Sequence, residues 1–405
     1  MQKYDLLIVG GGMVGLTLAL AVRKLTGQSV AIVETNTPTP LNGQPELRVS
    51  AINAASEQLF SSLGVWQDIV AQRSQAYTHM HVWDKSGVGA LDFDINDLSV
   101  KRNRESLGHI IENKVIRNAL WQKAEQDSGI WLLTDSKLTS IAFGEHEVFS
   151  SFESGMPVLA KLVVGADGAH SWLRQQMDMP IAFRDYDNHA LVATIKTELG
   201  HQDTAWQVFL PEGPLALLPL YQSNLCSIVW STSPSEAKRI STLSSEAMAK
   251  ELTAASDGKL GNISIESEVI NFPVSMRLAH SFVKGKAVLV GDAAHTIHPL
   301  AGQGVNLGLL DAIALAESLA NESYAAASDP LARQLAQYSR WRRAGAADMV
   351  AAMELIKQAF TPQHPALKLI RGIGMTAISN LGPVKDLMIK QALGLSGDLP
   401  DMAKA

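Results

Sequence analysis

The chain opens with the sequence YDLLIVGGGMVG at residues 4–15, and this stretch decides the fold. Its first six residues form a short apolar run, which is typical of a parallel strand buried on both faces. Three glycines follow in the spacing G-x-G-x-x-G, namely Gly10, Gly12 and Gly15. A helical pattern then leads to a second apolar strand that ends at Glu34. This order of strand, glycine turn, helix, strand and acid predicts a Rossmann-like unit that binds a dinucleotide.

Each part of this unit has a physical role in binding phosphate and ribose. Gly10 permits the tight turn, Gly12 lets the backbone approach a pyrophosphate, and Gly15 lets helix and strand pack closely. The helix N-terminus offers free N–H groups and a partial positive charge to the phosphates. Glu34 is placed to accept a hydrogen bond from a ribose hydroxyl, and a carboxylate there disfavours a 2′-phosphate. The site should therefore hold FAD or NAD and not NADP.

A second glycine-rich stretch lies near the other end of the chain. The sequence KAVLVGDAAH at residues 286–295 is again a buried-strand pattern that runs into a turn, and PLAGQGVNLG follows at residues 299–308. Between the two ends, residues 163–171 are VVGADGAHS. These three motifs, in this order, resemble those of the group A flavoprotein aromatic hydroxylases. The resemblance implies an FAD-dependent monooxygenase.

The resemblance assigns roles to residues of all three motifs. It implies that Asp292 contacts the FAD ribityl chain, and that the middle motif serves both FAD and the pyridine nucleotide. It places Arg48 near FAD and the active-site cavity; a surface arginine that caps a helix is the alternative. It places Asn113 against FAD, although relatives have the longer Arg or Gln there. The expected cofactor-binding residues are Gly10, Gly12, Gly15, Glu34, Arg48, Asn113, Asp167, Gly168, Gly291, Asp292, Gly302, Gly304 and Asn306.

Few protein acids or bases are expected, because in this family the cofactor performs the difficult chemistry. The resemblance implies that NAD(P)H reduces FAD, that O2 adds at flavin C4a, and that the hydroperoxide oxygenates an electron-rich ring. Pro299 and Gly302 are expected to line the reacting face of the flavin. His295 is expected to shape the turn or the flavin environment. His295 and His298 are three residues apart, but no further ligand cluster accompanies them, so we expect no metal site.

Several stretches narrow the resemblance to bacterial ubiquinone-biosynthesis hydroxylases, with most likeness to the 2-octaprenylphenol hydroxylases. They include RVSAINAAS at residues 48–56, LGVWQDI at 63–69 and QALGLSGDLP at 391–400. The implied reaction is hydroxylation of a 2-polyprenylphenol, ortho to the phenol, with NAD(P)H and O2. One alternative is a sibling hydroxylase that acts at another ring carbon. Others are an FAD oxidoreductase that inserts no oxygen, and a non-catalytic flavoprotein, which the intact turn at residues 302–304 disfavours.

The element pattern predicts an α/β fold with a Rossmann-like FAD-binding domain of the aromatic-hydroxylase type, an inserted, mostly antiparallel β-sheet substrate domain, and C-terminal helices. A helical pattern is expected from Arg48 to about Leu63, and a long amphipathic helix over 331–360. The expected domains are a discontinuous FAD-binding domain (1–76, 101–177 and 278–330), a substrate domain (77–100 and 178–277) and a C-terminal helical region (331–405).

Composition and charge exclude some partners and favour others. The net charge of −6 gives no reason to expect nucleic acid. The single cysteine, Cys226, lies in an apolar run and is interpreted as a buried structural thiol. No apolar run reaches the length of a membrane span, and the N-terminal run lacks the basic lead of a signal peptide. We therefore expect a cytoplasmic location, and separately we expect a homo-oligomer.

The implied substrate carries a long isoprenoid tail, and each CH₂ left in water costs about 0.8 kcal/mol. Because of that cost, we expect the protein to act at the inner face of the cytoplasmic membrane or together with other ubiquinone-biosynthesis proteins. The cluster RWRR at residues 340–343 is interpreted as a solvated helix face or a contact for nucleotide phosphate, a partner or anionic lipid. The apolar segment after Pro365 suits either a packed helix or a membrane-touching surface.

Overall fold

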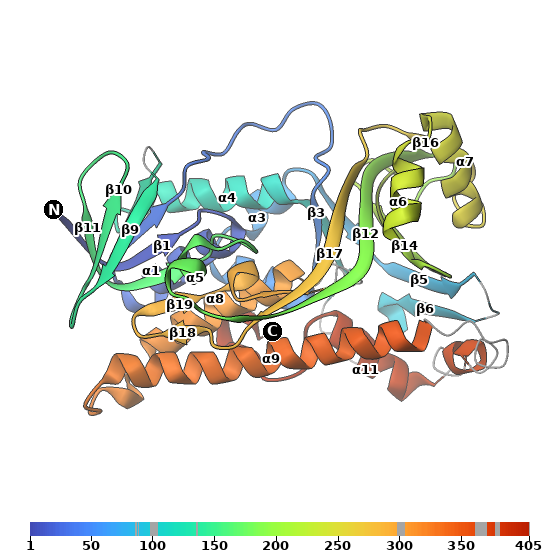
Figure 1. Ribbon diagram of the computed structural model, residues 1–405. Coiled ribbons are helices and arrows are strands. Elements are labelled where there is room, and N and C mark those ends of the chain that lie inside the picture. Colours follow the sequence, from blue (N-terminus) through green and yellow to red (C-terminus); the bar gives the residue numbers. More distant parts are fainter. Residues whose placement is uncertain are drawn as a thin grey trace.

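The computed structural model describes residues 1–85, 87, 89–97, 104–134, 137–297, 304–360, 371–376 and 381–404. Within them the chain forms two large sheets and one small sheet, with helices packed around them (Figure 1). The first sheet is mostly parallel and carries the N-terminal glycine turn, while the second is mostly antiparallel. The α/β class predicted from the sequence is confirmed.

The first sheet is organised around β1 (Gln2–Val9), which pairs in parallel with β11 (Val158–Gly165) and β2 (Val30–Val33). Both faces of β1 are covered: Ile8 packs into the helical core, and Leu7 packs on the side of β9 and β10. This explains the nearly continuous apolar run. The order is β18-β19-β11-β1-β2-β8, with β10 and β9 continuing from β11. The remaining bounds are β8 Ile130–Leu133, β9 Leu138–Phe143, β10 Val148–Phe152, β18 Val283–Lys284 and β19 Ala287–Leu289.

Helices cover the Ile8 face of this sheet (Figure 1). They are α1 (Met13–Thr26), α4 (Asn113–Glu125) and α8 (Gly304–Ala320). Because α1 and α8 both contribute to the same core as Ile8, the N-terminal motif and the motif near residue 300 are brought together. The short helices α2 (Ala54–Ser62), α3 (Trp66–Val70) and α5 (Trp172–Gln176) complete this part of the chain.

The second sheet has the order β20-β17-β12-β15-β14-β13-β5-β6, and β16 also pairs with β12. Its strands pair antiparallel except β13 with β5. Figure 1 shows β12 and β17 running from the first sheet into the second. The bounds are β5 His79–Asp84, β6 Ala90–Asp94, β12 Ile181–Thr197, β13 Thr204–Leu210, β14 Gly213–Pro219, β15 Leu225–Thr232, β16 Ile263–Ile265, β17 Ile270–Ala279 and β20 His295–Thr296.

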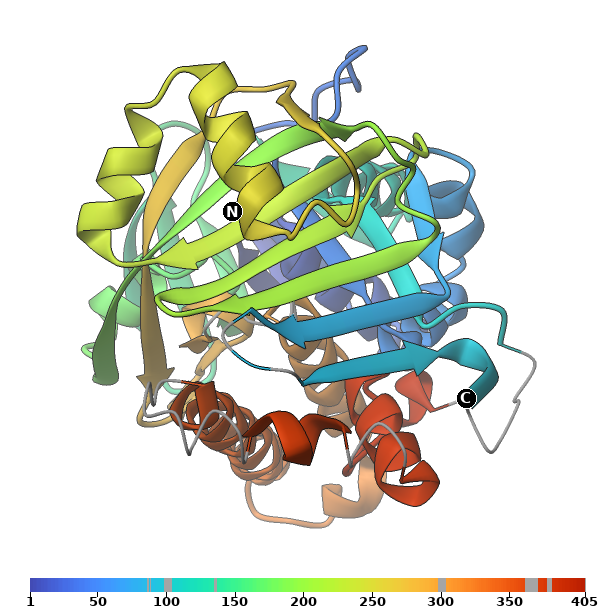
Figure 2. The same cartoon turned by 90° about the vertical axis from the view of Figure 1, so that its right-hand side faces the viewer.

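Two helices, α6 (Pro234–Ser241) and α7 (Ser245–Ala255), pack on one face of the second sheet (Figure 2). Their buried residues share a core with the sheet around Cys226. Cys226 is fully buried, and that burial raises the pKa of its thiol to about 12. The interpretation of a buried structural thiol is therefore confirmed.

The helix expected to open at Arg48 is wrong in its first turn. Residues Val49–Ile52 form strand β3, which pairs with β7 (Gly108–Glu112), and β7 also pairs with β4 (Ser74–Tyr77). The helix begins only after Asn53, whose side chain accepts a hydrogen bond from the Ser56 N–H and caps α2. The strand depends on pairing with residues about sixty positions away, which local periodicity does not report.

The long helix expected over 331–360 is confirmed as α9 (Pro330–Phe360), which runs beneath both sheets in Figure 1. Residues 371–376 are helical, and α11 (Gly382–Ala392) follows. Apolar side chains of these segments, among them Met375 and Ile389, pack against residues of β5 and β6. Short 3₁₀ turns occur at η1 Ile95–Asp97, η2 Gly291–Ala293, η4 Glu322–Tyr324 and η5 Asp401–Ala403.

Two further points concern the whole described chain. None of its helices combines the length and the apolar character that a membrane span needs. The sheets do not follow the expected domain bounds throughout: His295–Thr296 lies in the range assigned to the FAD-binding domain, yet it pairs with β17 of the second sheet. The division into domains stays a prediction.

Candidate flavin site

The N-terminal glycine turn has the shape of a phosphate cradle. Gly10 has a φ of +110°, and a side chain there would overlap the Ala166 carbonyl. A side chain at Gly15 would overlap the Gly10 carbonyl oxygen, so Gly15 brings α1 close to the turn. At Gly12, by contrast, a Cβ would meet no described atom within 4 Å. Gly12 starts α1 without a side-chain cap, so open space adjoins free N–H groups at a helix N-terminus.

Glu34 lies beside this turn, at the end of β2. Its carboxylate accepts hydrogen bonds from the Gly11 N–H at 3.0 Å and the Asn36 N–H at 2.8 Å. Arg117 of α4 donates through Nε to the Gly11 carbonyl at 2.9 Å, and its Nη2 lies 3.7 Å from Glu34. Arg117 thus fixes both the turn and the acid. No sequence motif marked Arg117, because it reaches the turn only through the packing of α4 on α1.

The third motif meets the first motif at Gly291. Gly291 has a φ of +59°, and a Cβ there would lie 3.2 Å from both Val14 methyl carbons of α1. On its other side, a Cβ at Gly308 of α8 would lie 3.0 Å from the Gly291 Cα. The turn at residues 291–293 is therefore packed between the two helices. Motifs separated by nearly three hundred residues form one site.

Asp292 presents a free carboxylate in this site. No described residue donates a hydrogen bond to it, and its side chain is exposed. Desolvation by the surrounding protein nevertheless raises its pKa, while the charges of His295 and Arg48 act in the opposite direction. The Asp292 carboxylate is thus exposed and has no hydrogen-bond donor among the described residues. Such a carboxylate is suited to accept hydrogen bonds from ligand hydroxyls.

His295 and Asp311 are joined by a buried hydrogen bond behind the turn. The His295 Nε2 lies 2.5 Å from the Asp311 Oδ2, and the Arg342 Nε lies 2.7 Å from the Asp311 Oδ1. All three side chains are buried. Arg342 belongs to the RWRR cluster, so a solvated or ligand-binding face is wrong for this residue. His295 points into this network, a geometry that favours shaping of the turn over contact with flavin.

The middle motif lies against the first. The Ala166 N–H donates to the Val9 carbonyl at 2.8 Å, which joins the ends of β11 and β1. Asp167 Oδ2 accepts from the N–H groups of Trp172 and Leu173, at 2.7 and 3.2 Å. Its Oδ1 is buried without a partner in the described chain. Gly168 has a φ of +81°, and a Cβ there would meet no described atom within 4 Å.

Arg48 and Asn113 come together at a cavity of about 420 Å³. The Asn113 N–H donates to the Arg48 carbonyl at 2.9 Å, and the Ser50 hydroxyl donates to the Asn113 Oδ1 at 2.6 Å. Glu268 and Ile270, next to and within β17, line the same cavity. The cavity therefore lies between the small sheet and the second sheet. Arg48 is exposed, as both interpretations of it require.

The other expected site residues differ in what the structure shows. Asn306 is buried, and its amide is engaged by the protein: Oδ1 accepts from the Asn53 N–H and the Ser56 hydroxyl, and Nδ2 donates to the Ala51 carbonyl. Gly304 begins α8, and a Cβ there would meet no described atom within 4 Å. Pro299 and Gly302 lie outside the described residues. In the described ranges, no group of three or more His, Cys, Asp or Glu residues is placed to hold a metal.

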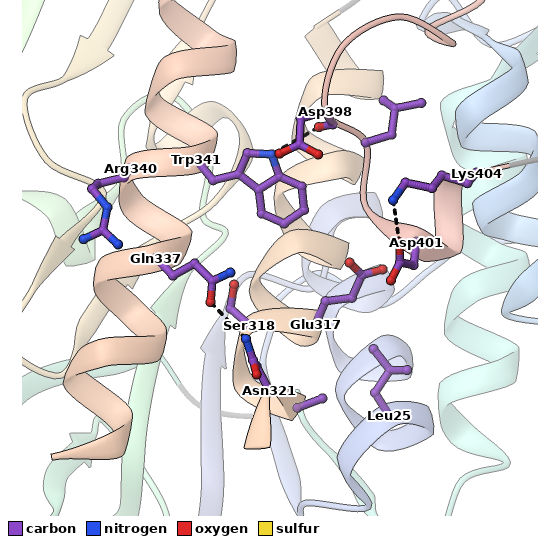
Figure 3. Close-up of a pocket in the computed structure, with 12 residues that line it drawn as sticks. Leu25, Glu317, Ser318, Asn321, Gln337, Arg340, Trp341, Asp398, Asp401 and Lys404 are labelled. Atoms are coloured by element: carbon purple, nitrogen blue, oxygen red, sulfur yellow. Dashed lines mark hydrogen bonds and ion pairs between the residues drawn. The ribbon is translucent and has the colours of Figure 1, made fainter. Parts of the chain in front are cut away.

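Figure 3 shows a larger cavity, of about 750 Å³. None of its lining residues belongs to the three motifs. It is bounded by the ends of α1 and α8, by α9 and by the C-terminal residues 398–404. Several lining groups are used by the protein: the Trp341 Nε1 donates to the Asp398 carbonyl at 3.1 Å, and the Met402 N–H donates to Glu317 at 2.9 Å. None of the glycine turns reaches it, so volume alone does not mark the flavin site.

The donor and acceptor groups at the joined motifs fit FAD. Free N–H groups beside Gly12 suit a pyrophosphate, Glu34 suits a ribose hydroxyl, and the unpartnered Asp292 suits a polyol chain. Comparison with known proteins agrees with this fit. A family model described as "FAD binding domain" matches residues 3–353. The 3-demethoxyubiquinol 3-hydroxylase of Escherichia coli (strain K12) is 36% identical over 401 residues, which cover 97% of this chain and 99% of that protein.

The chain belongs to the family of FAD-dependent ubiquinone-biosynthesis hydroxylases. It is similar to ubiquinone hydroxylase UbiL of Rhodospirillum rubrum, with 31% identity over 96% of this chain and 89% of that protein. The crystal structure of p-nitrophenol 4-monooxygenase PnpA from Pseudomonas putida DLL-E4 matches with a TM-score of 0.77 at 19% identity, covering 97% of this chain and 99% of that chain. The latter likeness shows the fold. As a family member the chain is an FAD-dependent monooxygenase, and NAD(P)H is the typical cosubstrate of the family.

Proposed function

We propose that this monooxygenase hydroxylates the aromatic ring of a polyprenylated ubiquinone precursor, with NAD(P)H and O2 as cosubstrates. The observation that carries the proposal is similarity over nearly the full length of relatives that are named for this chemistry. The flavin supplies the oxygen-activating chemistry when bound. The protein has to bind FAD, orient the ring and keep water from the reacting face.

The ring position has two candidates. The sequence stretches quoted above favour a 2-polyprenylphenol that is hydroxylated ortho to the phenol. The Escherichia coli relative is named for 3-demethoxyubiquinol, and its 36% identity over 97% of the chain favours that sibling step. We take 3-demethoxyubiquinol as the first candidate substrate and 2-polyprenylphenol as the second.

The experiment is NADH and NADPH oxidation by FAD-loaded protein with short-chain analogues of both substrates in detergent. Products are identified by mass spectrometry and NMR. A new ring hydroxyl on the demethoxyquinol supports the first candidate, and one ortho to the phenol supports the second. Hydrogen peroxide alone, or no oxidation with either analogue, counts against ring hydroxylation of these substrates.

We place FAD in the joined motifs. Gly10, Gly12 and Gly15 would face the pyrophosphate, Glu34 the ribose, and the Gly291–Asp292 turn the ribityl chain. The proposed FAD site also includes Arg48, Asn113, Asp167, Gly168, Gly302, Gly304 and Asn306, with Pro299 and Gly302 at the reacting face. The engaged amide of Asn306 supports a role in holding the start of α8 against β3 and α2.

The tail of the proposed substrate favours contact with a membrane surface. Seven exposed, large apolar side chains lie on the C-terminal helices or, for Leu381, directly before α11. We call them the C-terminal apolar group: Leu355, Ile356, Ile373, Leu381, Val384, Leu387 and Met388. Within α11, Val384, Leu387 and Met388 share one helix face, because they are spaced three and four residues apart. Figure 2 shows these helices along one side of the molecule. We propose that this side meets lipid; a pathway protein is the alternative occupant. Cytoplasmic location and a homo-oligomeric state stay predictions.

A further inference from the structure

The Asp311 carboxylate is the centre of a buried network that joins three parts of the fold. It receives the Gly291 N–H at 3.1 Å and the His295 Nε2 at 2.5 Å, both on Oδ2. It receives the Arg342 Nε at 2.7 Å on Oδ1. Asp311 lies in α8, Arg342 in α9, and His295 four residues after Gly291. The three side chains are 0%, 3% and 1% exposed, respectively.

This network keeps a charge in a place where charge is disfavoured. Burial alone raises the pKa of the Asp311 carboxyl, but the charges and hydrogen bonds of His295 and Arg342 outweigh it and hold the pKa below its usual value. The carboxylate therefore stays ionised and accepts from all three donors at once. Three donors from different parts of the fold hold this buried carboxylate in one position. The carboxylate in turn restricts the positions of its three partners.

The partner that matters for the cofactor is the Gly291 N–H. Gly291 is held on its two sides by Val14 and Gly308, and its backbone lies in the left-handed region. Asp311 adds a directed hydrogen bond to this packing. The next residue is Asp292, whose carboxylate no described residue holds. The position of that carboxylate is therefore set through the backbone at Gly291.

We propose that Asp311, His295 and Arg342 act as positioning residues that fix the Gly291–Asp292 turn for FAD. The three side chains form a buried clamp behind the turn, and they act through Asp292 without touching the cofactor. The clamp rests on the proposed placement of FAD at Asp292. It goes beyond that placement because it gives functional roles to Asp311 and Arg342, which are not among the expected cofactor-binding residues.

The test is FAD titration of apoprotein by fluorescence, together with visible circular dichroism of the bound flavin. Neither measurement needs the substrate. His295→Ala and Arg342→Met should each weaken FAD binding about tenfold or more, the scale of a lost charge-assisted hydrogen bond, and should change the flavin dichroism. His295→Gln should restore both readouts toward wild type, because the Gln amide nitrogen can donate where the His295 Nε2 does.

Tyr338→Phe is the matched control. Tyr338 lies on α9 one turn before Arg342, is fully buried, and donates to the Leu289 carbonyl at 2.7 Å. Its loss should lower thermal stability and leave FAD affinity and dichroism unchanged. The clamp is overturned if folded His295→Ala keeps wild-type affinity and dichroism, or if Tyr338→Phe weakens FAD as strongly as Arg342→Met does.

Asp292→Ala separates the clamp from the placement on which it rests. If Asp292→Ala leaves FAD affinity unchanged, FAD does not contact Asp292, and the clamp falls together with the placement. If Asp292→Ala weakens FAD but His295→Ala and Arg342→Met do not, the placement stands and the clamp alone is wrong. Weakening by all three variants, with recovery in His295→Gln, supports the clamp.

Discussion

Gly308 of α8 packs directly on Gly291 of the third motif: a Cβ on Gly308 would lie 3.0 Å from the Gly291 Cα and 3.0 Å from the Val14 Cγ2. Three elements therefore converge so closely that a methyl group on Gly308 would require its neighbours to shift. The contact explains why a glycine is needed inside a helix, where it costs roughly 1 kcal/mol relative to alanine. It also means that one added carbon atom at residue 308 would disturb the contact between the N-terminal motif and the third motif.

Gly308→Ala should therefore separate α8 from the turn. We expect a loss of about 1–3 kcal/mol of stability from overpacking, and weaker FAD binding, because the displaced turn carries Asp292. Chemical denaturation of the apoprotein and FAD titration measure the two effects. Gly304→Ala is the control for stability, because a Cβ there meets no described atom within 4 Å. Equal stability of the two variants would contradict the tight packing at Gly308.

Gly12→Val should remove FAD binding and leave the apoprotein folded. The backbone of Gly12 is extended, with φ −80° and ψ −176°, so valine fits it without strain. The side chain would enter the open space assigned to the pyrophosphate. We expect flavin-free protein whose stability lies within about 1 kcal/mol of apo wild type. Gly15→Ala is the contrasting variant and should destabilise the fold itself. Stoichiometric FAD in purified Gly12→Val would refute the placement.

Asp292→Asn should stabilise the apoprotein while weakening FAD binding. The folded-state pKa of Asp292 is raised, so its ionised form costs stability above that pKa, and the cost disappears as the pH falls through it. The amide carries no such cost. Thermal melts of wild type and variant should therefore differ at neutral pH, with the variant higher, and converge in acid. A variant that melts below wild type at pH 7 would argue against a raised pKa of Asp292 in the folded protein.

Arg342→Met should destabilise the protein by about 3–5 kcal/mol at neutral pH, because it leaves the Asp311 charge buried with one partner fewer. The folded-state pKa of Asp311 is depressed, so its stabilising contribution is present above the unfolded value of about 3.9 and is lost as the pH falls through the lower folded value. The difference between wild type and variant should accordingly shrink toward acidic pH. Urea denaturation at a series of pH values measures it. A difference independent of pH would show that packing, and not the ion pair, is lost.

Leu387→Gln should reduce binding to phospholipid vesicles if the C-terminal apolar group meets lipid. The Leu387 side chain is 63% exposed, so the change should cost little stability. Met156, 61% exposed and remote in sequence, provides the matched control as Met156→Gln. Vesicle flotation is the measurement. Wild type that ignores vesicles but binds another ubiquinone-biosynthesis protein through Leu387 would favour the partner; binding to neither would discard this surface.

Much of the site follows from local sequence. The glycine spacing, the strand before it and the acid after it are short-range signals, and the structure brings them together as expected. What local sequence does not report is pairing between distant segments. The local sequence of β3 predicts a helix, and only its pairing with β7 makes it a strand. Arg117 reaches the glycine turn only because α4 packs on α1.

The buried network around Asp311 is a second example of this limit, because its charged residues are paired across two helices. Arg342 lies among three other cationic or aromatic residues in a cluster that resembles a solvated helix face. Its partner Asp311 is 31 residues away, on another helix, and only the packing of α8 against α9 brings them together. The sequence of an amphipathic helix does not show whether one of its charged residues contacts water or a buried carboxylate.

Cys226 gives this chain an experimental advantage. It is the only cysteine in the sequence, it lies inside the second sheet, and its thiol remains protonated at neutral pH. Maleimide or nitroxide reagents, which need an accessible thiolate, should leave it untouched. A cysteine introduced at an exposed position such as Leu387 would then be the sole labelling site in an otherwise native chain. A spin label or fluorophore there could report whether α11 enters a lipid headgroup layer, without any prior replacement of native residues.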